Sequence, residues 1–144
     1  MAYLKLAHIG YVVPRMESAL KRFLAEGATI LIPPTYDPNQ YVEVTLLQID
    51  GETPVELVAP TDHPDCPIKA RLARGGGLDH LCYFTEDIEK SIKKEEAAGA
   101  MIVCQPTYAI AFKRDVAFLM RRSGLVIEFM TDEETSGDRN NARK

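Results

Sequence analysis

Polar and apolar residues alternate along two stretches of the chain, 4–13 and 78–85, and both stretches are rich in β-forming side chains. Alternation with a period of two is typical of a strand with one buried face. A segment with the helical period follows the first stretch, and its apolar stripe consists of Met16, Ala19, Leu20, Phe23 and Leu24. A weaker stripe over 87–98 follows the second stretch. The patterns therefore predict a strand and then a helix in each half of the chain.

Three β-rich runs follow each helix, at 28–32, 41–49 and 54–58 in the first half and at 100–104, 115–120 and 124–130 in the second. Gly27 and Gly99 stand where a helix needs a left-handed residue after its C-terminus. Between the halves, a proline after Cys66 predicts a short helix that ends near Arg74. We interpret the glycines at 75–77 as a turn, because a phosphate-binding loop would precede a helix and here a strand follows.

The two halves repeat each other when the chain is shifted by 72 positions, with 15 identities between 6–56 and 78–128 and no gap. The repeat predicts two βαβββ modules and an α+β fold. We expect one domain over 1–131, with module one at 4–60, a linker at 61–77 and module two at 78–131. The tail at 132–144 has no apolar residue except one alanine, so we expect it to be disordered.

Composition limits the function classes. The chain has 144 residues, is 46% hydrophobic and carries 17 basic against 21 acidic side chains, so its net charge of −4 excludes a basic nucleic-acid footprint. No apolar run reaches the length of a membrane span, and the first residues lack a signal-peptide pattern. Three widely spaced cysteines, Cys66, Cys82 and Cys104, do not make a disulfide framework. We expect a cytoplasmic protein.

The repeat also duplicates two metal-capable residues, because His8 and His80 each precede a glutamate, Glu56 or Glu128, by 48 positions. A polar side chain inside an apolar strand is costly unless it is paired or bound to a metal. If the modules pair with pseudo-twofold symmetry, the four side chains converge on one divalent ion, with Co²⁺, Ni²⁺, Zn²⁺, Mn²⁺ and Fe²⁺ all suited to such ligands. The alternative is two hydrogen-bonded core histidines and two glutamates on exposed edges.

Glu43 alternates onto one strand face with Thr45 and Leu47, where it serves either as a general base or as a solvated residue. His63 and Cys66 have no second metal-binding pair beside them, and we treat them as surface residues. The sequence contains no HExxH and no CxxC motif. Basic side chains flank the seventh predicted strand and either bind a substrate anion or form a solvated hairpin: Lys113, Arg114, Arg121 and Arg122.

Several segments together resemble the vicinal oxygen chelate superfamily, and within it methylmalonyl-CoA epimerases: LAHIGYVV, VEVTLLQ, PVELVAP, CPIKARLARGGGLDHLCYFTEDIEKSI and SGLVIEF. The resemblance implies a glyoxalase-like curved mixed sheet around a central metal site. It also implies that His8, His80 and Glu128 are metal ligands, and that Glu43 and Glu128 are the acid/base residues. Glu56 stands where those epimerases usually carry Gln, and the resulting His-Glu-His-Glu set is similar to that of bacterial lactoylglutathione lyases.

Two segments depart from the epimerase pattern, since 109–113 replaces a glycine-rich stretch and 120–122 replaces His-Pro-Lys. We predict a metal-dependent enzyme that moves a proton next to a carbonyl, with epimerisation of an acyl-CoA such as methylmalonyl-CoA as its reaction. Lactoylglutathione lyase activity and a non-catalytic ligand-binding or resistance role are the alternatives. The expected partners are a small carbonyl substrate and a second copy of the chain, with no nucleic acid or membrane.

Overall fold

The computed structural model describes residues 4–136. The described chain divides into two compact units, one from His8 to Asp79 and one formed by residues 80–136 together with residues 4–7. The linker therefore belongs to the first unit, and the first strand contributes to both. The division after Asp79 lies two positions from the expected start of module two.

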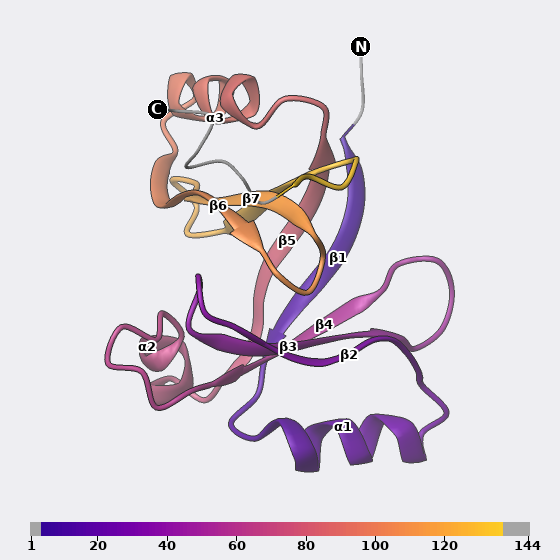
Figure 1. Cartoon of the computed structure of the whole chain (residues 1–144). Helices are drawn as coiled ribbons and strands as arrows, with labels where there is room; N and C mark the ends of the chain where they lie inside the picture. The colour runs from indigo at the N-terminus through magenta and orange to yellow at the C-terminus, as the bar shows by residue number, and fades with distance from the viewer. Residues whose placement is uncertain (1–3, 137–144) are drawn as a thin grey trace. The chain divides into compact units, whose positions relative to one another are not determined.

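The first unit is a four-stranded mixed sheet with the order β2-β3-β4-β1 (Figure 1). In it β1 and β4 run parallel, and the other neighbours are antiparallel. Its elements are β1 (Lys5–Val12), α1 (Met16–Ala25), β2 (Thr29–Asp37), β3 (Val42–Gln48), β4 (Val55–Pro60) and α2 (Lys69–Ala73).

The second unit repeats this plan, with the order β5-β8-β7-β6 and a parallel pair formed by β5 and β8. Its elements are β5 (Gly77–Thr85), α3 (Ile88–Ala97), β6 (Met101–Ala109), β7 (Arg114–Met120) and β8 (Val126–Thr131). The α+β class and the two βαβββ modules are confirmed.

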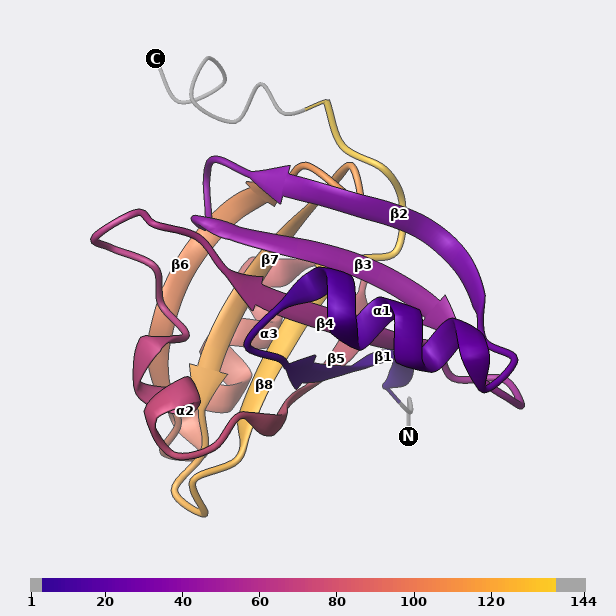
Figure 2. The same ribbon diagram turned by 90° about the horizontal axis from the view of Figure 1, so that it is seen from below.

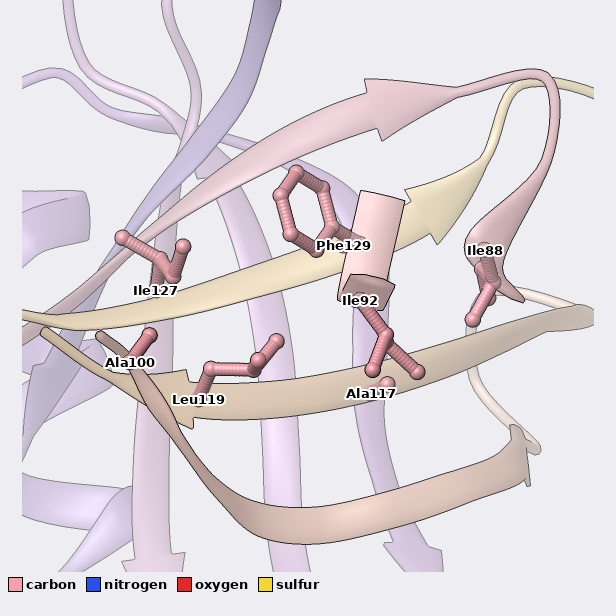
Figure 3. Close-up of a cluster of buried hydrophobic side chains, with 7 residues drawn as sticks. All are labelled: Ile88, Ile92, Ala100, Ala117, Leu119, Ile127 and Phe129. Atoms are coloured by element: carbon pink, nitrogen blue, oxygen red, sulfur yellow. The ribbon is translucent and has the colours of Figure 1, made fainter. Parts of the chain in front are cut away.

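Each sheet buries one face against the helix of its own module. Met16 of α1 packs against Leu47, Leu57 and Ala59, and Figure 2 shows α1 lying across β3 and β4. In the second unit α3 contributes Ile88 and Ile92 to a cluster (Figure 3) that is completed by Ala100, which directly precedes β6, and by four strand residues: Ala117, Leu119, Ile127 and Phe129. Because neighbours along a strand point to opposite sides, Glu128 lies on the face away from α3.

Both helices end as the repeat predicts. Gly27 and Gly99 each have a φ of +99°, and the residues after them, Ala28 and Ala100, donate their backbone N–H groups to the carbonyls of Phe23 and Glu95. This pattern is a Schellman motif, which satisfies carbonyls at the end of the helix. The glycines therefore have a conformational reason at both positions.

Several boundaries differ from the sequence expectations. Strands β2 and β6 continue past their prolines to Asp37 and Ala109, because each is the outermost strand of its half and loses no ladder partner there. The linker helix is only five residues long. Residues 132–136 make backbone hydrogen bonds to Thr85 and Lys113, whereas 137–144 of the expected disordered tail lie outside the described residues. No helix in the described part of the chain is long and apolar enough to cross a membrane.

Candidate metal centre

The first unit brings His8 and Glu56 together on neighbouring parallel strands. Gly10 of β1 pairs with Glu56 of β4, so His8, two residues earlier, points to the same side of the sheet as the carboxylate. The His8 Nε2 and Glu56 Oε1 atoms are 3.4 Å apart. Both side chains are buried, which places a polar pair inside the first unit.

The second unit reproduces this pair with His80 and Glu128. Cys82 of β5 pairs with Glu128 of β8, and the His80 Nε2 atom is 3.1 Å from the Glu128 Oε1 atom. The ring of Phe118 meets the imidazole edge-on, with 5.2 Å between the ring centroids. Phe118 also pairs with Glu128 across β7 and β8, so it lies on the same face.

The burial of these residues decides between the two readings of the glutamates. Glu56 is 5% exposed and Glu128 only 2%, so the alternative with glutamates on exposed edges is wrong. A buried carboxylate needs an opposite charge, hydrogen-bond donors or a metal ion.

The donor chemistry suits a divalent metal ion. All four side chains are buried, and each offers one ligand atom, a histidine nitrogen or a carboxylate oxygen. Mixed nitrogen and oxygen ligands of this kind suit several divalent transition metals, so the set fits the expected cofactor without selecting one ion.

The third predicted glutamate does not share a face with Glu56. Along β3 and β4, Glu43 pairs with Ala59, whereas Glu56 pairs with Leu46. Paired residues of antiparallel strands point to the same side, and Leu46 is three positions from Glu43. Glu43 therefore lies on the face that packs against α1, with Ala59 and Thr45. This register argues against the acid/base role expected for Glu43.

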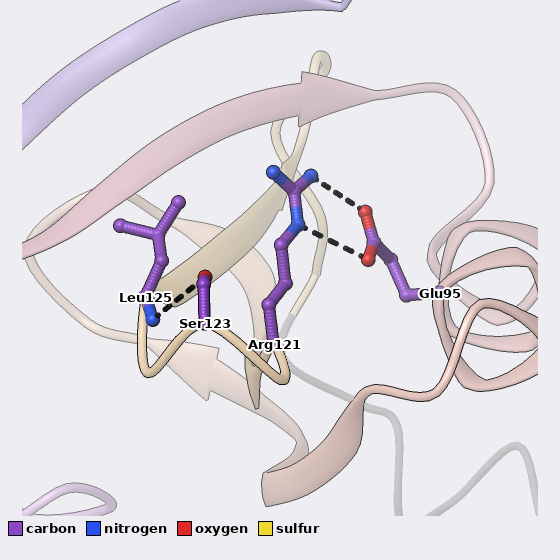
Figure 4. Close-up of polar contacts among 4 residues, drawn as sticks. All are labelled: Glu95, Arg121, Ser123 and Leu125. Atoms are coloured by element: carbon purple, nitrogen blue, oxygen red, sulfur yellow. Dashed lines mark hydrogen bonds and ion pairs between the residues drawn. The ribbon is translucent and has the colours of Figure 1, made fainter.

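The predicted basic cluster is divided between the two ends of β7. Lys113 and Arg114 stand at its start, and Arg121 and Arg122 follow its end. Arg121 donates two hydrogen bonds to Glu95 of α3, at 3.2 and 2.7 Å (Figure 4). Hydrogen bonding to Glu95 raises the pKa of Arg121 despite its partial burial. Arg121 is thus committed to an internal ion pair, and the four residues do not act as one anion site.

His63 and Cys66, the two candidate residues of the linker, both make contacts within the first unit or lie buried in it. The ring of His63 stacks on Tyr41 with 3.6 Å between the centroids and 2° between the planes, and its Nδ1 accepts the N–H of Asp65. Cys66 and Cys82 are both buried, so Cys66 is not a surface residue, and none of the three cysteines forms a disulfide.

One buried acid was not singled out from the sequence. Asp37 is 1% exposed, and its carboxylate accepts hydrogen bonds from the backbone of Asn39 and Gln40 and from the Gln40 side chain. The Asp-Pro-Asn sequence was the available signal, since Asp commonly binds the backbone two residues later in turns. Asp37 holds the turn between β2 and β3.

Two βαβββ modules, each with a buried histidine on its first strand and a buried glutamate on its last, define a protein of the glyoxalase-type α+β class. Residues 7–118 match the family model described as the Glyoxalase/Bleomycin resistance protein/Dioxygenase superfamily. The chain belongs to this superfamily.

Individual relatives agree with this assignment. An ethylmalonyl-CoA/methylmalonyl-CoA epimerase from Cereibacter sphaeroides is 28% identical over 101 residues, which are 69% of this chain and 74% of that protein. A hypothetical protein from Bacillus halodurans C-125 has a similar structure, with a TM-score of 0.78, 26% identity and coverage of 94% of this chain and 99% of the other. Methylmalonyl-CoA epimerase from Mycobacterium tuberculosis shares the fold, with a TM-score of 0.76, 20% identity and coverage of 97% and 92%.

Proposed function

We propose that this chain is a divalent-metal-dependent enzyme that moves a proton on the carbon next to a thioester carbonyl. The proposed reaction is the epimerisation of an acyl-CoA such as methylmalonyl-CoA. The observation that carries the proposal is the pair of repeat-related, buried His–Glu contacts, one in each unit. The 28% identity to an ethylmalonyl-CoA/methylmalonyl-CoA epimerase supports the substrate class.

The four residues His8, Glu56, His80 and Glu128 would hold one ion between them. We favour one shared ion because two ligands alone make a weak site, whereas structural and catalytic sites in proteins use three or four. A bound divalent ion supplies Lewis-acid polarisation of the substrate carbonyl, which makes the adjacent C–H group more acidic.

The carboxylates do the proton transfer in this proposal. Glu128 accepts the proton from the substrate carbon at a carboxylate oxygen, and in the reverse direction its protonated form delivers a proton to the same face. Inversion at carbon needs a second acid on the other side of the planar intermediate. We assign this role to Glu56 instead of Glu43, because Glu56 is the repeat-related counterpart of Glu128 and Glu43 lies on the α1 face. The apolar surroundings, including Phe118, limit the access of water to the reacting carbon.

Incorporation of deuterium tests this function directly. The protein is incubated with methylmalonyl-CoA in D₂O, with and without added Co²⁺ after chelation. We expect the α-hydrogen to exchange, and the exchange to stop after chelation and return with the ion. Absence of metal-dependent exchange with methylmalonyl-CoA and ethylmalonyl-CoA would overturn the proposal.

The glutathione-dependent alternative is supported by Glu56 and by the position of Glu43. With Glu43 on the α1 face, the remaining acids are the two of the His-Glu-His-Glu set. Isomerisation of the hemithioacetal formed from methylglyoxal and glutathione, followed by absorbance, distinguishes the two reactions. Activity in this assay combined with no α-exchange of acyl-CoA esters would favour the lyase.

Dimerisation and location in the cytoplasm stay predictions from the sequence. The mass of the purified protein in solution, measured by light scattering, tests the dimer: the expected value is twice the 16.1 kDa of one chain.

A further inference from the structure

Two cations lie against one aromatic ring in the second unit. The Nζ atom of Lys5 is 5.9 Å from the centroid of Phe84, and the guanidinium carbon of Arg114 is 5.5 Å from it. Both distances are within the range of cation–π contacts. Phe84 and Arg114 are half-buried and Lys5 is exposed, so the group is open to a ligand.

This group lies on the same side of the sheet as His80 and Glu128. Phe84 is two residues beyond Cys82, which pairs with Glu128, and Phe84 itself pairs with Met130. Since strands rise about 3.3 Å per residue, the ring lies about 7 Å along the sheet from the level of Glu128. A ligand whose carbonyl is at Glu128 can therefore place a second polar group, a few bonds away, at the cations.

Among the described residues, the two cations have no acidic partner. Within residues 4–136 neither Lys5 nor Arg114 forms an ion pair, and the Nε–H of Arg114 is buried without a hydrogen-bond acceptor. A buried donor without an acceptor is destabilising. Two positive charges and a free donor on one face are the features of a place for an anionic oxygen.

The repeat provides an internal comparison. The positions that correspond to Phe84 and Arg114 in module one are Val12 and Val42, which are 1% and 4% exposed and belong to the core. The fold therefore does not need a charge here, because the same position is apolar in the other module. The aromatic ring and the cation are specific to module two.

We propose that Lys5, Phe84 and Arg114 form an anion-binding subsite. It accepts a carboxylate or phosphate group of a ligand whose carbonyl lies at His80 and Glu128. The position of the carbonyl rests on the proposed function, whereas the binding of an anion does not. Arg114 makes the main contact, because its planar guanidinium binds oxyanions with two parallel hydrogen bonds.

Titration of simple anions into the full-length protein tests the subsite. Malonate represents a carboxylate source and pyrophosphate a phosphate source, and binding is followed by calorimetry. The variants are Arg114→Gln and Lys5→Gln. The matched control is Arg122→Gln, which removes the same charge from an exposed residue after the other end of β7. We expect Arg114→Gln to weaken binding of at least one anion about tenfold or more, and Lys5→Gln to weaken it less.

The outcomes separate the ligand sources and the two proposals. A loss confined to malonate assigns the subsite to an acyl carboxylate, and a loss confined to pyrophosphate assigns it to a carrier phosphate. If Arg114→Gln and Lys5→Gln bind both anions as Arg122→Gln does, or if the wild-type protein binds neither, the subsite is overturned. Exchange of the α-hydrogen in D₂O would still support the proposed function in that case. Circular dichroism of each variant confirms that it is folded.

Discussion

Glu43 and Glu128 are both carboxylates on β-strands, Glu43 on β3 and Glu128 on β8, but their strands turn them to different surroundings. Glu128 faces away from the core under α3 and contacts His80, whereas Glu43 shares a face with Thr45 and Ala59, beside α1. Alternation along β3 correctly grouped Glu43 with Thr45 and Leu47 in the sequence. It did not reveal which face was covered by the helix, because that depends on the register between β3 and β4.

Removal of each acid should therefore have a different effect. Glu128→Gln is expected to slow deuterium exchange by about 10² or more, the usual contribution of a general acid or base. Glu43→Gln, the matched amide substitution on the other face, is expected to stay within about threefold of the wild type. The exchange rate with methylmalonyl-CoA, measured by mass spectrometry, checks both values. A large loss in Glu43→Gln would return the acid/base role to that residue.

The helix starts show how two copies of one element have diverged. Asp87 caps α3 with its side chain, which accepts the N–H of Lys90, whereas the corresponding residue before α1 is Arg15, which makes no side-chain cap. Residue periodicity predicted both helices, but it carried no information about which of them is capped. The strands β2 and β6 were predicted too short for a related reason, since a proline is compatible with a strand only at the edge of a sheet.

The caps predict opposite effects of substitution at equivalent positions. Asp87→Ala should lower the free energy of unfolding by about 1 kcal/mol, because it leaves an N–H of the first turn without an acceptor. Arg15→Asp should raise the stability by a similar amount, since it adds the missing acceptor beside the positive end of the helix dipole. Urea denaturation measures both. Equal effects of Asp87→Ala and Arg15→Ala would show that the cap contributes nothing.

The turn before β5 depends on a glycine for two reasons. Gly76 has a φ of +71°, and an added Cβ would lie 2.8 Å from the carbonyl oxygen of Val12. Gly27 has a φ of +99° but no atom within 4 Å of such a Cβ. Gly76→Ala should therefore destabilise the protein by more than the ~1–2 kcal/mol expected from the left-handed conformation alone, and Gly27→Ala by about that amount. Thermal unfolding of both variants provides the comparison.

At the scale of the whole molecule, the repeat was the most informative feature of the sequence. It predicted both modules, the glycines that end helices α1 and α3, and both His–Glu pairs. A residue duplicated at equivalent positions of two modules occupies the same place in each copy of the fold. The repeat did not predict the separate surroundings of the basic residues around β7. Their grouping in the sequence hid the fact that Arg121 is paired with Glu95 while Arg114 lies against Phe84.

The proposed function depends most on a single ion held by both modules, and metal content is the measurement that tests it most directly. Elemental analysis is made of the untagged wild-type protein and of His8→Ala and His80→Ala, with Arg122→Gln as the folded control. We predict one divalent ion per chain in the wild type and the control, and a loss of most of it in either histidine variant. A wild-type protein without a stoichiometric ion, or a full complement retained after either substitution, would contradict the shared centre.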